Sequence, residues 1–259
     1  MPASPLNRAA VVRTLRDAGC VFAEDEAHLL VEAAKTPGEL ASLVEQRAAG
    51  MPLEHVLGWA DFSGLRVAVS PGVFVPRRRT ELLVRRAVAV AAPGTIVVDL
   101  ACGSGAVGIA VATLVGGVAL YAVDIEPAAV ACARRNLGPF GGKVYAGDLY
   151  AGLPGRLRGS VDVLLANVPY VPTEDVDLLP REARVHEPRV ALDGGPDGLD
   201  VVRRVAEAAP DWLAAGGHLL VETSADQADT AIETLRTAGF TTTVASDADL
   251  AATVVIGRR

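Results

Sequence analysis

Cysteine and histidine are scarce in this chain of 259 residues. The three cysteines and four histidines are scattered along the sequence, at Cys20, Cys102, Cys132, His28, His55, His186 and His218. Three scattered thiols cannot form a disulfide framework, and none of these residues has the spacing of a zinc site. We therefore expect no metal ion, and we expect a reducing, cytoplasmic environment for the protein.

Basic residues are also in short supply, since 24 lysines and arginines face 31 aspartates and glutamates and leave a formal charge of -7. An acidic average surface is unsuited to holding a duplex nucleic acid by its phosphates, so we expect no stable nucleic-acid complex. The first residues carry arginines where the apolar core of an export signal would stand, and we expect no such signal. No long heptad or apolar stripe indicates an obligate assembly, so a monomer is the default expectation.

One long stretch, between Asp99 and Asp124, contains no charged residue. Glycines near both of its ends leave about a dozen residues for a helix, roughly 18 Å in length. A hydrocarbon core is about 30 Å thick, so this stretch is too short to cross it. The sequence predicts a buried strand, loop, helix and strand here, and no membrane span.

The composition that remains is that of a compact globular protein, with 51% hydrophobic and 21% charged residues. From Asn7 to about Gly50 the apolar positions recur at helical spacing, with a break and restart at "TPGEL". The following "GWADFSGLRVAVSPGVFVPRRRTE" has the alternation and the glycines of a hairpin. We expect a helical N-terminal domain at 1–60, a hairpin linker at 61–79 and a larger domain at 80–259.

Strands and helices alternate through the larger domain. The strand-like segments are "TIVVDLA", "ALYAVD", "KVYAG", "VDVLLAN" and "HLLVET". Crossover helices between them predict a mostly parallel sheet, and "FTTTVASDADLAATVVIG" predicts an antiparallel hairpin at one edge. The predicted fold class is α/β, a doubly wound sheet. In such sheets ligands bind beyond the carboxyl ends of the strands, so functional residues are expected there.

The first strand of this domain ends in the glycine-rich turn "DLACGSG". A turn of this kind lets the backbone approach a ligand closely and points free N–H groups at it. Gly103 and Gly105 do not have the spacing of the dinucleotide fingerprint. Asp99 stands at the entrance of the loop, and an acid there suits a ligand with a cationic amino group better than one with a pyrophosphate.

The second and third strands each lead to an aspartate. Asp124 can accept both hydroxyls of a ribose, although it could instead cap the next helix, with Pro127 in the first turn. Asp148 can accept a hydrogen bond from an adenine amino group. Residues suited to an amino group, a ribose and an adenine thus stand at three successive strand ends, and these three groups are the parts of S-adenosylmethionine. The motif set resembles that of the class I methyltransferases.

The fourth strand ends in Asn167-Val168-Pro169-Tyr170. A carboxamide offers one acceptor and two donors, so Asn167 complements another planar amide. Pro169 fixes the turn and has no N–H to compete with a substrate, and Tyr170 supplies a flat wall. This construction favours a substrate nitrogen attached to an sp2 carbon, either an amide or the exocyclic amine of a base.

The chain resembles the HemK/PrmC family, the protein N5-glutamine methyltransferases that modify peptide chain release factors at their Gly-Gly-Gln loop. The resemblance extends over about 43–222 and rests on "EQRAAGMPLEHVLGWADFSGL", "VSPGVFVPRRRTELLV", "DLACGSGAVGIAVA", "ANVPYVP" and "HEPRVALDGGPDGLDVVRRVAEAAPDWLAAGGHLLVE". It implies a Rossmann-like methyltransferase domain with a seven-stranded sheet, and a small helical N-terminal domain that contacts the protein substrate.

The resemblance also implies the roles of individual residues. Cofactor binding is carried over to Asp99, Ala101, Cys102, Gly103, Gly105, Asp124, Ile125, Asp148, Leu149 and Asn167. The catalytic tetrapeptide is carried over to Asn167, Val168, Pro169 and Tyr170, of which Asn167, Pro169 and Tyr170 contact the acceptor glutamine. In the family the asparagine side chain and the carbonyl of the next residue engage the amide NH2.

The sequence departs from the family pattern at several places. Val168 replaces a proline, Ala101 replaces a common glycine, and the usual glycine and arginine before the last strand are missing. Arg77, Arg78 and Arg79 stand in "PRRRTE", where they are either solvated or face an acidic partner. Other acceptors therefore stay open, namely another protein, a small molecule or, less favoured, a nucleic-acid base, as does an inactive cofactor-binding protein.

Overall fold

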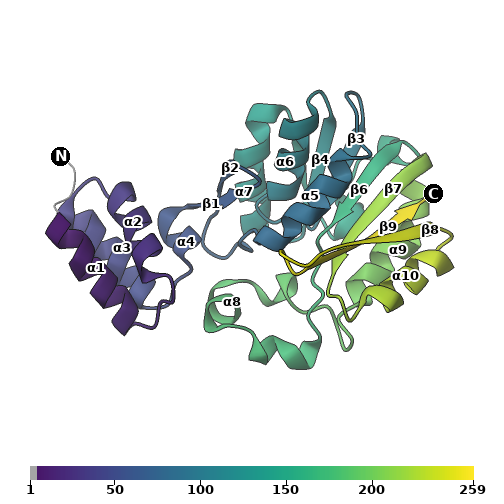
Figure 1. Cartoon of the computed structure of the whole chain (residues 1–259). Coiled ribbons are helices and arrows are strands. Elements are labelled where there is room, and N and C mark those ends of the chain that lie inside the picture. The colour runs from purple at the N-terminus through teal and green to yellow at the C-terminus, as the bar shows by residue number, and fades with distance from the viewer. Residues whose placement is uncertain (1–4) are drawn as a thin grey trace.

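The computed structural model describes residues 5–259 and begins with a small unit of four helices. These are α1 (Pro5–Asp17), α2 (Ala23–Ala33), α3 (Pro37–Ala48) and α4 (Leu53–Leu57). Leu15 and Leu30 are fully buried between them. The restart at "TPGEL" is confirmed: the Thr36 hydroxyl accepts a hydrogen bond of 3.1 Å from the Glu39 amide and caps α3. The unit lies at one end of the molecule, beside the sheet (Figure 1).

Arg47 of α3 joins this helical unit to the rest of the protein. Its side chain is 6% exposed, and its Nε atom lies 2.7 Å from the Glu26 carboxylate of α2. Its Nη1 atom lies 2.7 Å from the carboxylate of Glu182, which belongs to α8 (Arg181–His186). One buried guanidinium therefore contacts two helices that are more than 100 residues apart in the sequence.

An antiparallel hairpin follows α4 and consists of β1 (Trp59–Phe62) and β2 (Leu65–Ala68). Ser63 and Gly64 form its two-residue turn with φ angles of 49° and 75°, the left-handed pair that this turn requires. The hairpin begins at Trp59, so it includes two residues of the range 1–60 that we gave to the helical domain. The domain boundaries themselves stay predictions.

The sheet predicted for the larger domain is confirmed. Its order is β5-β4-β3-β6-β7-β9-β8. Neighbouring strands from β5 to β7 pair in parallel, and the pairs β7–β9 and β9–β8 are antiparallel. The strands are β3 (Ile96–Leu100), β4 (Ala119–Asp124), β5 (Lys143–Ala146), β6 (Val161–Ala166), β7 (Leu213–Thr223), β8 (Thr241–Asp247) and β9 (Ala252–Arg258). The strand order reverses between β3 and β6, so the loops that follow these strands diverge and leave a crevice.

Helices cover both faces of the sheet (Figure 1). One face carries α5 (Glu81–Val88), α6 (Ala106–Val115) and α7 (Pro127–Leu137), and the other carries α9 (Asp200–Trp212) and α10 (Ala228–Thr237). Short 3-10 turns lie at Arg78–Thr80, Gly138–Phe140, Leu149–Gly152, Gly155–Leu157, Thr173–Leu178 and Arg189–Ala191. Strand β6 is buried on both sides: Val163 and Leu165 face the first group of helices, and Leu164 and Ala166 face the second.

The uncharged stretch before Asp124 forms β3, the glycine loop, α6 and β4, as predicted. Within the described part of the chain, no helix has the length and apolar character needed to cross a membrane.

Candidate active site

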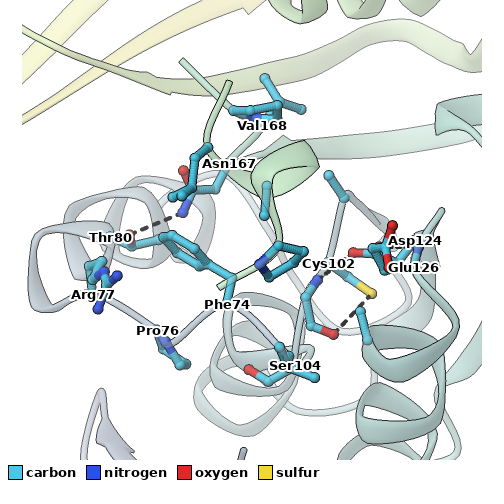
Figure 2. A pocket seen from close by; sticks show the side chains of 18 of the residues that line it. Phe74, Pro76, Arg77, Thr80, Cys102, Ser104, Asp124, Glu126, Asn167 and Val168 are labelled. Atoms are coloured by element: carbon cyan, nitrogen blue, oxygen red, sulfur yellow. Dashed lines mark hydrogen bonds between the residues drawn. The ribbon is translucent and has the colours of Figure 1, made fainter. Parts of the chain in front are cut away.

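A cavity of about 450 Å³ opens at the carboxyl ends of β3, β4 and β6. Ten of the predicted site residues line it: Asp99, Ala101, Cys102, Gly103, Asp124, Ile125, Asn167, Val168, Pro169 and Tyr170. Figure 2 shows Asn167 and Thr80 on one side of this cavity and Cys102, Asp124 and Glu126 on the other. Most of the residues predicted at the strand ends thus lie around one cavity, although their roles stay predictions.

Three predicted residues do not line the cavity: Gly105, Asp148 and Leu149. Gly105 precedes α6 with φ of 78°, and a Cβ there would overlap the Leu137 side chain, so the structure requires a glycine for packing. Leu149 is buried in the core below α9. The Asp148 carboxylate lies 2.6 Å from the Arg204 guanidinium, so an ion pair already occupies the group predicted to bind adenine.

Strand β3 positions Asp99 at the cavity, one residue before the strand ends. Asp99 is 1% exposed, and its Oδ2 atom accepts a hydrogen bond of 2.9 Å from the Gly108 amide of α6. Burial raises the pKa of this carboxyl group to about 7, and the charge of Asp124 acts in the same direction. Ala101 has φ of 52°, which explains why a glycine is common there in the family: a residue with a Cβ is strained in this conformation.

Asp124 connects the loops that follow β3 and β4 by hydrogen bonds. Its Oδ2 atom accepts a hydrogen bond of 2.8 Å from the Gly103 amide, and its Oδ1 atom accepts one of 2.9 Å from the Glu126 amide. The N-cap of α7 is Glu126 and Pro127 follows as the first helical residue, so the alternative that Asp124 caps this helix is wrong. Burial raises the pKa of the Asp124 carboxyl group, and the hydrogen bonds from backbone N–H groups oppose this rise.

The carboxamide of Asn167 is tied to the segment before α5. Its Nδ2 group donates a hydrogen bond of 3.2 Å to the hydroxyl oxygen of Thr80, which is 2% exposed (Figure 2). The Val168 side chain is 1% exposed and packs in the core, away from the cavity mouth. The hydroxyl of Tyr170 donates a hydrogen bond of 3.2 Å to the Glu222 carboxylate at the end of β7.

The "DGGPDG" segment and Gln227 hold the backbone at the end of this tetrapeptide and just after it. The Gly194 amide donates a hydrogen bond of 2.8 Å to the Val171 carbonyl, and the Gln227 side chain donates one of 2.8 Å to the Tyr170 carbonyl. A Cβ at Gly198 would overlap that same Tyr170 carbonyl oxygen, and its φ of 78° also requires glycine. The glycines of this segment therefore allow a close approach of two backbones.

Two of the three members of the arginine run lie near carboxylates of this same chain. Arg77 forms an ion pair of 2.5 Å with Glu187 and lies 4.8 Å above the Phe74 ring. The Nε atom of Arg79 lies 3.7 Å from Glu222. Arg78 and Arg79 are exposed, as the reading of a solvated run expects, whereas Arg77 is half-buried. The acidic partners of the run are carboxylates of this same chain.

Sequence reasoning missed several residues of the cavity wall, above all Phe74, Thr80 and the segment that runs from Leu179 to Leu192. Glu222 supports the wall from behind and was also missed. Phe74, Thr80, Glu222 and part of that segment lie in the motifs on which the family resemblance rests, and those motifs were the available signal. The search at the strand ends did not include them, because their place in the wall depends on contacts between segments that are distant in the sequence.

Replacing Val168 with proline is expected to leave turnover within about three-fold of the parent. The amide of Val168 donates no hydrogen bond within residues 5–259, so proline removes none, and the main-chain carbonyl is kept. Stability should change by about 0.4 to 1 kcal/mol through the unfolded chain. Steady-state kinetics and thermal unfolding measure both quantities, and a large loss of turnover would show that the valine side chain itself matters.

Comparison with known proteins gives consistent results. The family model described as "Methyltransferase small domain" matches residues 64–195. A release factor glutamine methyltransferase of Geobacter sulfurreducens is 40% identical over 209 residues, which cover 79% of this chain and 72% of the relative. One of Bifidobacterium longum is 34% identical and covers 92% of this chain and 90% of the relative. A methyltransferase structure from Pyrococcus furiosus superimposes with a TM-score of 0.57 at 16% identity, over 75% of this chain and 89% of that one, and shows the fold.

Proposed function

The chain belongs to the release factor glutamine methyltransferases, and from this premise we propose that it methylates the side-chain nitrogen of a glutamine in a peptide chain release factor, with S-adenosylmethionine as methyl donor. The observation that supports this best is the placement of Asn167 across one cavity from Asp124. A planar amide and a nucleoside with an amino-acid tail are the two ligands that such a cavity must hold together.

The residues on the Asp124 side fit this donor. Gly103 has open space where a Cβ would stand, so a ligand can approach its backbone closely. Asp124 can hold the ribose hydroxyls, and Ile125, which is 50% exposed beside the cavity, offers an apolar surface to the adenine ring. Asp99 supplies a carboxylate for the cationic amino group. When bound, S-adenosylmethionine supplies an electrophilic methyl group on sulfur.

On the other side of the cavity, Asn167 and its neighbours prepare the acceptor. An amide nitrogen is a poor nucleophile because its lone pair is delocalised into the carbonyl group. The Asn167 Oδ1 atom and the Val168 carbonyl oxygen would each accept a hydrogen bond from the acceptor NH2 and so aim its nitrogen. Orientation of this kind supplies up to about 7 to 11 kcal/mol in well-aligned cases. The same two oxygens stabilise positive charge that develops on the nitrogen.

Cofactor affinity is expected to rise with pH up to neutrality. The free Asp99 carboxyl group has its pKa raised to about 7, so below that pH it is mostly protonated and cannot neutralise a cationic amino group. Between about pH 5.5 and about pH 7 the α-amino group of the cofactor, with a pKa of about 7.7 to 8.0, stays charged. The dissociation constant should therefore fall up to about ten-fold per pH unit over this range.

Calorimetric titration at several pH values measures this dependence. The matched ligand is methylthioadenosine, which lacks the amino-acid part and should bind with little change over the same range. Asp99→Asn should bind the cofactor weakly at every pH. A dissociation constant that does not vary with pH in the wild type would remove Asp99 from the role of counter-charge.

The proposed reaction is tested by transfer of labelled methyl groups from S-adenosylmethionine to a purified release factor. We expect label on the glutamine of its Gly-Gly-Gln loop, located by mass spectrometry of the digested factor, and none on a factor in which that glutamine is alanine. If the cofactor binds but the factor stays unlabelled, the acceptor is a different protein or a small molecule. The search should then move to cell extract.

A further inference from the structure

Glu222 is a buried carboxylate that the reaction described above does not use. It lies near the end of β7, is 1% exposed, and accepts a hydrogen bond from the Tyr170 hydroxyl. Its Oε2 atom is the one buried side-chain oxygen or nitrogen, within the described residues, that has no hydrogen-bond partner. A buried polar atom without a partner is costly, so its retention beside the cavity calls for an explanation.

The Thr80 hydroxyl connects Glu222 to Asn167. Thr80 accepts a hydrogen bond from the Asn167 Nδ2 group, so its own single proton is available for a different acceptor. Both groups are buried, and each has one unused hydrogen-bonding capacity: the proton of the Thr80 hydroxyl and the Oε2 atom of Glu222. An ionised carboxylate can only accept, so Oε2 is the acceptor to which we assign the Thr80 proton. In agreement with this, the Thr80 hydroxyl, together with Arg79 and Tyr170, opposes the rise that burial produces in the pKa of the Glu222 carboxyl group.

The orientation of the Asn167 carboxamide matters because its two ends are nearly equal in shape and opposite in function. With Nδ2 donating to Thr80, Oδ1 is left for the NH2 group of an acceptor amide. If the carboxamide rotated by half a turn, it would present N–H groups to the N–H groups of the substrate, and no hydrogen bond could form. Something must therefore hold the carboxamide in one of two otherwise similar orientations.

We propose that Glu222 is a positioning residue which, through the Thr80 hydroxyl, holds the Asn167 carboxamide with its oxygen toward the acceptor amide. The proposal deepens the function proposed above and rests on it for the identity of the acceptor. The same carboxylate holds the Tyr170 hydroxyl, so two of the four residues of the tetrapeptide are oriented from one buried charge.

Kinetics of Thr80→Val and Glu222→Gln test the proposal. Valine keeps the shape of threonine without its hydroxyl, and glutamine keeps the shape of glutamate without its charge. Each should lower kcat by about 10- to 100-fold, the scale of a misplaced reacting group, with the cofactor dissociation constant unchanged within about two-fold. Thr80→Ser keeps the hydroxyl and should recover most of the lost turnover. Thr253→Val removes a hydroxyl from a threonine that is buried outside the cavity and should leave kcat unchanged.

A double-mutant cycle separates positioning from general stability. In an Asn167→Ala background, Thr80→Val should have almost no further effect on kcat, because the group that it positions is gone. Glu222→Gln should keep only the smaller loss that acts through Tyr170. A merely structural role would give the same fold-loss in both backgrounds, and that result would overturn the proposal. Should Thr80→Val fail to fold, as judged by cofactor binding, Thr80→Ala and Glu222→Gln carry the same cycle.

A second readout does not need the release factor. The side-chain NH2 signal of Asn167 in a 15N spectrum, identified by its loss in Asn167→Ala, should shift in Thr80→Val and in Glu222→Gln but not in Thr253→Val. If the wild type fails to methylate the factor while these shifts occur, the acceptor is misidentified and the positioning role stands. If the chemical shift of the Asn167 side-chain NH2 group is unchanged in both variants, the positioning role is contradicted, whatever the acceptor is.

Discussion

Asn167→Ala is expected to reduce methyl transfer to the release factor by about 100- to 1000-fold, the loss typical of removing one fixed hydrogen-bonding group from a transition-state site. The substitution takes away the side-chain oxygen that would aim the acceptor nitrogen, and it leaves the Thr80 hydroxyl without its present donor. The Val168 carbonyl remains, which is why we expect residual transfer above the uncatalysed rate.

The same substitution should change cofactor affinity by no more than about three-fold, since the loop hydrogen bonds to Asp124 are untouched. Single-turnover transfer of label and calorimetric titration of the cofactor, run on the same preparation, separate the two effects. The control is Asn136→Ala, compared at saturating cofactor. It removes a buried asparagine that does not line the cavity itself but ties the hairpin at Ala68 to the Ser104 carbonyl of the glycine loop. Equal losses of transfer in the two variants would mean that Asn167 contributes to the fold and not to the acceptor site.

Asp124→Ala is expected to weaken cofactor binding by at least about 100-fold. The carboxylate holds the Gly103 and Glu126 amides, so its removal loosens the loop as well as taking away the group proposed for the ribose. Hydrogen bonds to charged groups contribute about 1.5 to 3 kcal/mol each, and two of them at the lower value already correspond to a change of this size.

The control for this prediction is Asp148→Ala, because both aspartates follow a parallel strand and only Asp124 lines the cavity. Asp148 is paired with Arg204, and we expect its loss to change the cofactor dissociation constant by less than about three-fold, as for an exposed ion pair. Titration of both variants with S-adenosylmethionine compares their dissociation constants. A loss in Asp148→Ala as large as in Asp124→Ala would restore the adenine role that the strand-end reasoning gave to Asp148.

The parts of the fold that the sequence predicted are those that depend on local patterns. The buried strands before Asp99, Asp124 and Asn167 read as continuous apolar runs, and the structure places all three residues at one edge of the sheet. The prediction was less accurate for β7, which begins at Leu213 instead of His218, because two glycines broke the strand pattern. Strand pairing supplied the stability that local propensity lacked.

The parts that the sequence could not predict depend on contacts across long distances in the chain. For Arg77 and Arg79 the sequence left open a solvated run or an acidic partner. It could not identify Glu187 and Glu222, because these residues lie more than 100 residues later. Thr80 was predicted only as the first residue of the larger domain, yet its hydroxyl accepts a hydrogen bond from the Asn167 carboxamide. For Asp148, the position after a strand was predicted correctly, but the competing Arg204 on α9 was not visible in any local pattern.

The buried guanidinium of Arg47 has a consequence for how this sequence can change over evolutionary time. Breaking a buried ion pair by removing one partner typically costs about 3 to 5 kcal/mol, a large share of the stability of a small domain. Glu26 is buried together with Arg47, so a neutral residue at position 26 is tolerated best when position 47 is replaced as well. The Glu182 side chain is 45% exposed, and its loss costs less. Positions 26 and 47 should therefore vary together among descendants of this protein, with a weaker link to position 182 of α8.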